Sequence, residues 1–488
     1  MRKSLLHVIA LLVSVAANVV AQDVFTLNAT GTWTTGGNWT IVRDGNNPGT
    51  NTYPGQSTVN DSPDGADIVI VPAGTFRTVS INAVSPTIGG LSIVNGKVNM
   101  SSNNTNVILT VVDSVHIYAG STLTDTSGNG NCALRLAGTL FNDGTLDFQT
   151  ASGSDSLYFN GSGHSYIYGN GSFDLLQLQL TKSSATDSIV NRSSTFSQGI
   201  DPAAVVGATV FISGVYSHQN PDTAIFSNGA VTIGVNARLH VPQGVVKLVN
   251  STANTTATLT GALVIDGGIV RVAQGVNTAP FQALAAGAGS TASLSVSNGG
   301  RLYVGTDGNF GDIRFDNGGS FNISGSTTQV YAGSLVSGAT ATSVNGTIDA
   351  AQVNLGYGRT TAGGVYYMRG RSVHNILNGA IVTLGRDTVG DLRVDQAPTG
   401  NVSSALHVTG SSTVFRINGE IISATVNAPL KIDINGGAVY VADTLNVLST
   451  NPTWVYMGNA GTADSLIIRG GGRFEFGRNV TTVNATGG

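Results

Sequence analysis

Apolar and polar residues alternate in short runs along most of this 488-residue chain. A period of two places every second side chain on the same side of a strand, so each run predicts a half-buried β-strand. The runs lack the apolar period of a helix, and even residues 174–180 alternate as a strand does. The clearest predicted strands are 78–81, 91–94, 107–112, 134–136, 145–148, 231–233, 263–272, 294–304, 313–323, 380–384, 406–417, 431–447 and 465–476.

A Gly-Gly turn followed by an alternating strand recurs along the chain. Glycine supplies the positive φ of a tight turn. Neighbouring copies lie 19, 32 and 35 residues apart, as expected for coils that carry loops of different length. Copies begin at Gly267, Gly299, Gly318, Gly436 and Gly471, and looser ones at Asn95 and Asn378.

One repeated turn-and-strand unit favours an all-β parallel β-helix, which we expect to be right-handed. In this fold each coil contributes strands that hydrogen-bond to the coils above and below. An array of β-sandwich modules is the alternative, and it would show hairpins at a regular spacing of about 8–12 residues.

The N-terminal part of the chain differs from the repeats. Residues 1–21 have the charge, apolar core and small-residue end of a secretory signal peptide. Residues 22–75 hold Trp33 and Trp39 and are predicted to form an N-terminal cap, although the two rings could instead form a sugar-binding platform. Residues 76–488 are the predicted repeats, which we expect to continue beyond residue 488.

Composition narrows the function. Charged residues are 10 % of the chain, against roughly 25 % in typical proteins, and the net charge is −4 with no basic run, which excludes nucleic acid as an expected partner. No apolar run predicts a transmembrane segment. Cys132 is the single cysteine, so the coils must be held together by stacking rather than by an intrachain disulfide.

The N-terminal motifs resemble the start of large secreted β-helix proteins of Bacteroidota. The similar segments are Gly31-Thr32-Trp33, Gly37-Asn38-Trp39, Tyr53-Pro54-Gly55 and Asp67-Ile68-Val69-Ile70. Members of that family are mostly adhesins or surface-layer and matrix proteins, many exported by the type IX system through a C-terminal sorting domain, which is not recognisable here.

The resemblance implies a non-enzymatic structural or adhesive protein, secreted or held at the surface of a Gram-negative cell. Surface polysaccharides, or glycans of a host or neighbouring cell, are the implied ligands, and an outer-membrane partner would anchor the protein.

The resemblance also implies O-glycosylation, because Bacteroidota modify Asp-Ser/Thr-apolar tripeptides. The alternative is that Asp-Ser is a turn pair leading into a strand. The candidate hydroxyls are those of Ser114, Ser156, Ser188, Thr223, Thr388, Thr444 and Ser465.

The second function weighed is a carbohydrate-active β-helix, either a polysaccharide lyase or hydrolase or a carbohydrate-binding repeat protein. Glycoside hydrolysis needs two carboxylates across one bond, whereas Glu420 and Glu475 are isolated in the sequence. No catalytic residue and no cofactor is therefore predicted.

No metal site is predicted: two acidic stretches are weak calcium candidates, and turn formation is the favoured role of their aspartates. The denser one is Asp307, Asp312 and Asp316, and the weaker one is Asp387, Asp391 and Asp395 beside Arg386 and Arg393. Exposed tyrosines can stack on sugar rings, and a local density of them occurs here, but ordinary core or ladder packing is the favoured interpretation. Those residues are Tyr303, Tyr331, Tyr357, Tyr366 and Tyr367.

Overall fold

The computed structural model contains strands throughout the part of the chain that it describes, together with one short 3-10 turn, η2 (Gly36–Asn38). The predicted all-β class is confirmed. The chain divides into two compact units, Met1–Leu178 and Gln179–Gly488. The described residues are 23–43, 52–56, 67–82, 84–100, 106–125, 131–148, 155–196, 209–226, 230–248, 256–273, 282–286, 291–306, 309–315, 318–338, 343–356, 364–369, 372–385, 390–394, 404–423, 430–441, 454–457, 465–476 and 482–485.

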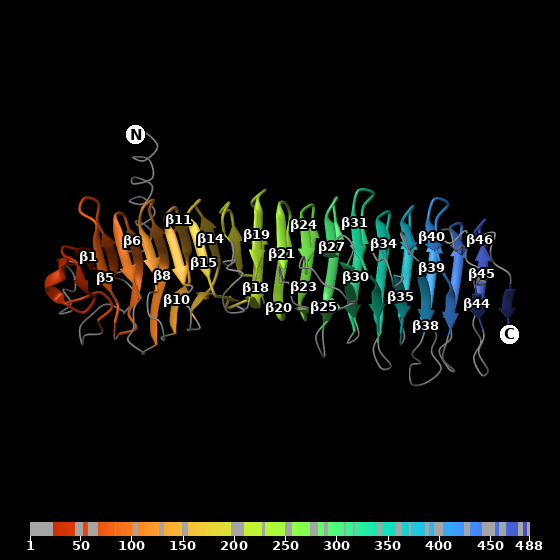
Figure 1. Cartoon of the computed structure of the whole chain (residues 1–488), viewed down its shortest axis with the longest axis horizontal. Coiled ribbons are helices and arrows are strands. Elements are labelled where there is room, and N and C mark those ends of the chain that lie inside the picture. Colours follow the sequence, from red (N-terminus) through yellow and green to blue (C-terminus); the bar gives the residue numbers. More distant parts are fainter. Residues whose placement is uncertain are drawn as a thin grey trace. The chain divides into compact units, whose positions relative to one another are not determined.

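The first unit stacks parallel strands in two sheets (Figure 1). Long strands turn a corner of the coil, so that the first half of β8 pairs with β10 and its second half with β11. One sheet contains β1 (Val24–Leu27), β3 (Trp39–Val42), β4 (Ile68–Val71), β6 (Thr87–Ile93), β8 (Val107–Ile117), β10 (Cys132–Leu136), β11 (Thr139–Asn142), β13 (Ser156–Phe159) and β14 (His164–Tyr168). The other contains β2 (Gly31–Thr32), β5 (Arg77–Ser80), β7 (Gly96–Asn99), β9 (Thr122–Thr124), β12 (Thr145–Phe148) and β15 (Ser172–Leu175). Strand β16 (Gln177–Thr181) includes the residues at which the units divide.

The second unit begins with β17 (Ser188–Asn191), β18 (Thr209–His218), β19 (Thr223–Phe226), β20 (Val231–Val241) and β21 (Val245–Leu248). From β22 onward each coil contributes one strand to each of three faces. The first face is β22 (Ala257–Leu259), β25 (Gln282–Ala286), β29 (Asp312–Phe315), β32 (Leu335–Ser337), β35 (Val365–Met368), β38 (Asp391–Val394), β41 (Ile421–Ser423), β44 (Trp454–Met457) and β47 (Thr482–Ala485).

The second face is β23 (Ala262–Asp266), β26 (Ser293–Ser297), β30 (Gly319–Ser324), β33 (Val344–Asp349), β36 (Val373–Leu377), β39 (Ser404–Thr409), β42 (Leu430–Asn435) and β45 (Ser465–Arg469). The third face is β24 (Ile269–Val272), β27 (Arg301–Thr306), β31 (Gln329–Ala332), β34 (Gln352–Leu355), β37 (Ile381–Leu384), β40 (Val414–Ile417), β43 (Ala438–Val441) and β46 (Arg473–Phe476). Strand β28 (Asn309–Phe310) pairs antiparallel with β27. Along each face, each strand pairs in parallel with the strand one coil away, which confirms the predicted parallel β-helix.

Coils differ in length while their strands stay in register. Ile313 pairs with Leu335, 22 residues further on, whereas Ile421 pairs with Val455, 34 residues further on. The difference is taken up between strands, because surface loops tolerate insertions at little cost in free energy. This accounts for the imperfect period of the sequence.

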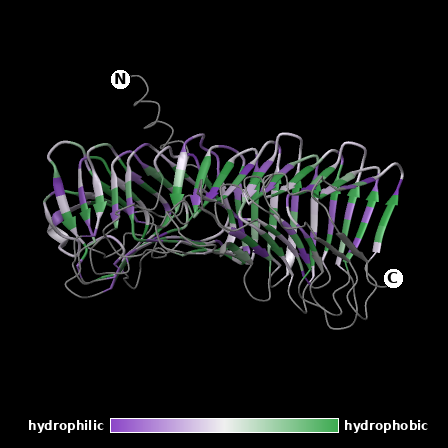
Figure 2. Ribbon diagram, turned by 45° about the vertical axis from the view of Figure 1, so that its right-hand side comes forward, coloured by the Kyte–Doolittle hydropathy of each residue, from purple (hydrophilic) through white to green (hydrophobic). Residues whose placement is uncertain are grey.

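The core is a set of in-register columns of apolar side chains. Alternation along each strand turns one set of residues inward, and Figure 2 shows hydrophobic and hydrophilic positions alternating along the strands. Burying one such Val or Leu side chain stabilises the fold by about 1.5–3 kcal/mol. One column of the third face, at most 1 % exposed, is Val270, Leu302, Val330, Val353, Val382, Phe415 and Val439.

The two glycines of the repeated turn have different roles. The first, as in Gly299 with φ 79°, adopts a left-handed conformation that other residues avoid. The second lies against the neighbouring coil: a Cβ on Gly300 would be 2.7 Å from the carbonyl oxygen of Ile265. The copy at Gly318 is different, because it leads into β30 on the second face rather than into a third-face strand. Its 19-residue spacing is therefore not a coil length.

Both N-terminal tryptophans are buried in the first unit. Trp33 is fully buried and donates a hydrogen bond from Nε1 to the carbonyl oxygen of Pro54 (2.9 Å). Trp39 is 5 % exposed, packs edge-on against Trp33, and donates to the Trp33 carbonyl oxygen (2.8 Å). Their burial makes the sugar-platform alternative wrong. Among the described strands, β3 pairs with β1 alone and runs antiparallel to it, at the edge of the parallel stack.

We expect Gly300→Ala to lower the free energy of unfolding by about 1–3 kcal/mol, because the added methyl group must push back the adjacent coil. The matched control is Ala380→Gly, since Asn378 and Gly379 have left-handed φ values, 52° and 88°, like the 52° and 79° of Asn298 and Gly299. In this turn Ala380 already holds a buried Cβ. This control should cost about 1 kcal/mol or less. Denaturant unfolding measures both, and an unchanged Gly300→Ala protein would contradict the assigned role.

Candidate functional site

Five aromatic rings gather on the outside of the first unit, and we call them the aromatic patch. Four of them are contributed by the second half of β8, by β11 and by β14, which belong to successive coils, and the fifth, Tyr118, directly follows β8. His116 is paired with Phe141, and Phe141 with Tyr168, so the sheet register places these three rings in one column. The patch consists of His116, Tyr118, Phe141, Tyr166 and Tyr168.

The rings contact one another from coil to coil. Ring centroids are 4.0 Å apart for His116 and Phe141, 5.1 Å for Phe141 and Tyr168, and 5.7 Å for Tyr166 and Tyr168. Since carbon atoms in contact are about 3.5–4.0 Å apart, the two longer distances mean that the nearly parallel rings are laterally offset. Part of each ring therefore stays uncovered by its neighbour. Tyr118 is 36 % exposed, and the other four rings are half-buried.

His116 behaves as a neutral aromatic ring in this patch. Burial lowers its pKa to about 4, although Asp143 acts in the opposite direction. Its Nε2 atom is buried without a hydrogen-bond partner in the described structure. The patch is thus apolar at neutral pH, apart from its tyrosine hydroxyls.

Sequence reasoning missed this patch. Its column comes from positions 116, 141 and 168, whose unequal spacing gives no visible repeat. The available signal was local: Tyr166 and Tyr168 alternate on one strand, as do His116 and Tyr118 at the end of β8. Only the coil register brings these two pairs and Phe141 together.

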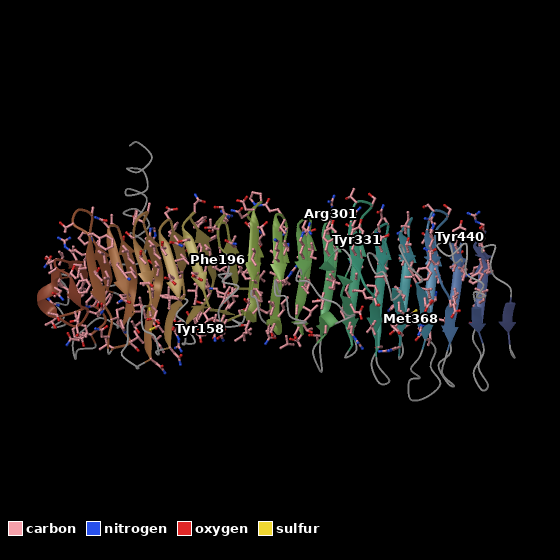
Figure 3. The ribbon with its side chains drawn as sticks, viewed as in Figure 1. Tyr158, Phe196, Arg301, Tyr331, Met368 and Tyr440 are labelled. Carbon is pink, nitrogen blue, oxygen red and sulfur yellow. The ribbon has the colours of Figure 1, made fainter. Side chains whose placement is uncertain are left out.

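The tyrosines weighed as a sugar-stacking group do not form one cluster. Tyr303 and Tyr331 stack at 5.1 Å with an interplanar angle of 1°, and the Arg271 guanidinium lies 4.8 Å from the Tyr303 ring centroid. This is coil-to-coil ladder packing on the third face, where Figure 3 labels Tyr331. Tyr367 points outward beside Arg369, whose guanidinium lies 4.7 Å from its ring centroid. Tyr357 lies outside the described residues.

Tyr366 is fully buried, which agrees with the favoured core packing and rules out a sugar contact for this ring. Its hydroxyl forms a 2.8 Å hydrogen bond with Nδ1 of His374, which is 1 % exposed. Burial raises the pKa of Tyr366 and lowers that of His374 to about 3, so both groups are neutral at pH 7. The Nε2 atom of His374 has no hydrogen-bond partner in the described structure.

The two acidic stretches lie mostly outside the described residues. Asp307 and Asp316 of the calcium candidate, and Asp387, Asp395 and Arg386 of the weaker one, are not described. Asp312 is half-buried at the start of β29. Asp391 is 8 % exposed, and its two oxygens accept hydrogen bonds from the Arg393 guanidinium (2.7 Å) and the Glu420 amide (2.9 Å). The turn-forming role expected of Asp307, Asp312 and Asp316, rather than calcium binding, stays a prediction.

The candidate glycosylation positions have unlike surroundings. Thr223 is exposed, while Ser114, Ser188 and Ser465 are half-buried, and Thr388 and Thr444 lie outside the described residues. Ser156 is 2 % exposed and donates a hydrogen bond to Gln177. Modification of these hydroxyls stays a prediction.

The aspartates of these tripeptides have structural roles. The Asp187 carboxylate accepts a hydrogen bond from the Ser184 amide (3.0 Å), and Asp155 accepts one from the Cys132 amide (2.8 Å). Such contacts fit the alternative of a turn pair leading into a strand.

One group of three possible metal ligands occurs in the described part of the chain: Asp125, Cys132 and Asp155, with ligand atoms within 4.8 Å of one another. All three are buried. Burial raises the pKa of the Cys132 thiol to about 12, and the two carboxylates add to the shift. The thiol keeps its proton and donates it to the Met100 carbonyl oxygen (2.8 Å), so Cys132 is a poor nucleophile.

Comparison with known proteins finds no matching family model, no matching curated protein and no matching solved structure. Within the described residues, no helix has the length and apolar character required to span a membrane. The class that the fold defines is the parallel β-solenoid.

We expect the stability of the protein to fall as the pH is lowered because of His374. In an unfolded chain its pKa is about 6.5, whereas in the fold it is about 3. Protonation therefore favours unfolding, and stability is lost from about pH 6.5 towards about pH 3, by up to about 1.4 kcal/mol per pH unit.

The double variant Tyr366→Phe/His374→Leu should show a shallower fall in melting temperature between about pH 7 and about pH 4 than the parent. Exposed His164 provides the control, His164→Leu, which should keep the parent's pH dependence. If the melting temperature falls equally steeply with pH in the parent and in the double variant, His374 is not the cause of the loss of stability.

Proposed function

We propose that this protein is a non-enzymatic, extracellular adhesive scaffold that binds polysaccharide through the aromatic patch of its first unit. The observation that carries the proposal is the grouping of five partly uncovered rings on one outer face. Solvent-exposed aromatic clusters are uncommon on proteins that have no partner and generally mark a binding surface. The signal-like residues 1–21 and the resemblance of the N-terminal motifs support a place outside the cell.

The chemistry of the patch suits a sugar chain. The apolar C–H face of a pyranose packs on an aromatic ring, while hydroxyl groups beside the ring satisfy the sugar hydroxyls. Such hydroxyls flank the patch: Ser92 pairs with His116 on the neighbouring coil, and Ser114 pairs with Thr139. Because each ring is fixed on a paired strand, little conformational entropy is lost on binding.

The alternative function, a polysaccharide lyase or hydrolase, would draw on Asp391, Glu420 and Arg393 on the first face of the second unit. Here both Asp391 oxygens already accept hydrogen bonds, and one of them is paired with a guanidinium. Because both of its oxygens are engaged within the protein, this carboxylate is poorly placed to exchange a proton with a sugar as a general acid or base must. The adhesive function is therefore the better supported of the two.

The double variant Phe141→Ser/Tyr168→Ser should weaken polysaccharide binding at least about tenfold, because two rings contribute upwards of about 1.4 kcal/mol together. The matched control is Tyr303→Ser/Tyr331→Ser, which removes a stacked pair of rings outside the patch. Glycan-array screening followed by titration calorimetry on the best ligand measures the effect. The proposal fails if the parent binds no glycan, or if the patch variant binds as the parent does.

A further inference from the structure

A second outer surface of the protein carries a regular set of small polar side chains, which we call the polar grid. It lies on the second face of the second unit, on β26, β30 and β33 (β30 is labelled in Figure 1). The register pairs Ser293 with Ser320 and then Asn345, and Ser295 with Asn322 and then Thr347. The grid therefore has two columns of three, with about 4.8 Å between coils and about 6.6 Å between columns.

The grid side chains are open to solvent. Ser320, Asn322 and Asn345 are exposed, and the other three are half-buried. None of the six makes a side-chain hydrogen bond to the described part of the protein. The neighbouring column differs, because Ser297 donates to Asp266 (2.8 Å) and Asp349 accepts from Asn378 (2.8 Å). In contrast to that column, the six grid side chains keep their donors and acceptors available.

Folding alone does not require hydroxyl and amide side chains at the six grid positions. Next to the grid, both outward positions of β23 are aliphatic, Ala262 and Val264. On β36 the first column ends at Val373, whereas the second continues with the amide of Asn375. An ordinary solvent-facing strand also carries charged residues, and the six grid residues carry none. The contacts within the protein thus leave the run of six hydroxyl and amide groups unexplained.

We propose that the polar grid binds a neutral, extended polysaccharide lying across successive coils, with one sugar per coil. The inference rests on the proposed function and adds a second site to it. Hydroxyl and amide groups both donate and accept hydrogen bonds, as sugar hydroxyls do, and the absence of charge selects a neutral polymer. The side chains are short and their strands are paired on both sides, so ordering them on binding costs little entropy.

The test compares two matched double variants of the full chain. Asn322→Val/Thr347→Val removes the middle of one grid column, and valine preserves strand propensity. Asn354→Val/Thr383→Val makes the same two changes at outward, paired positions on the third face. Both variants should melt as the parent does, within a few degrees. Depletion from solution by insoluble cellulose and by chitin measures binding, with alginate beads as the acidic polymer.

We expect the grid variant to bind the neutral polymers at least fivefold more weakly than the parent, and the third-face variant to bind them equally well. Binding to alginate should not change. The inference is overturned if the grid variant binds as the third-face variant does, or if the parent binds neither neutral polymer.

The patch variant Phe141→Ser/Tyr168→Ser, tested beside these, separates the two proposals. If only the grid variant loses binding, the polar grid is supported as a binding site and the aromatic patch is not the main site. If only the patch variant loses binding, the polar grid is overturned as a site and the proposed function stands.

Discussion

Parallel, in-register hydrogen bonding between one coil and the next is the interaction on which the rest of this structure depends. It places each paired residue beside a counterpart in the neighbouring coils, so that side chains at equivalent positions form columns along the stack. Inward, this produces columns such as Leu302, Val330 and Val353, which exclude water without a disulfide. Outward, it turns single side chains into arrays, of which the aromatic patch and the polar grid are the two with evident chemistry.

The sequence predicts the fold class well because the relevant signal is local. Strict alternation specifies strands, and glycine at positions such as 299 and 300 specifies turns, for reasons that the backbone confirms: a left-handed φ at the first and a close carbonyl at the second. Similar local motifs can also be misinterpreted. The glycines at 318 and 319 match the repeated turn motif but lead into β30, a strand of another face. The motif alone does not show which corner of the coil a turn occupies.

The candidate site is less predictable, since it depends on distances along the stack rather than along the chain. His116, Phe141 and Tyr168 are neighbours only after the register is known. Conversely, Tyr366 and Tyr367 are adjacent in sequence and face opposite sides of the sheet, one into the core and one outward. A high local density of tyrosines in the sequence therefore does not show whether their rings lie on the surface or in the core, because successive residues of a strand point to opposite sides.

The lack of long-range cross-links has a mechanical consequence. In a solenoid each coil contacts only its immediate neighbours. Unfolding can therefore proceed from one coil to the next and need not involve the whole domain at once. A load applied to the chain at one end would detach the outermost coil first and leave the register of the remaining coils intact. Each detached coil adds its own length to the extended chain, for example the 22 residues from Ile313 to Leu335 or the 34 from Ile421 to Val455. Under tension such a stack would therefore unfold in steps, and each step would absorb mechanical work.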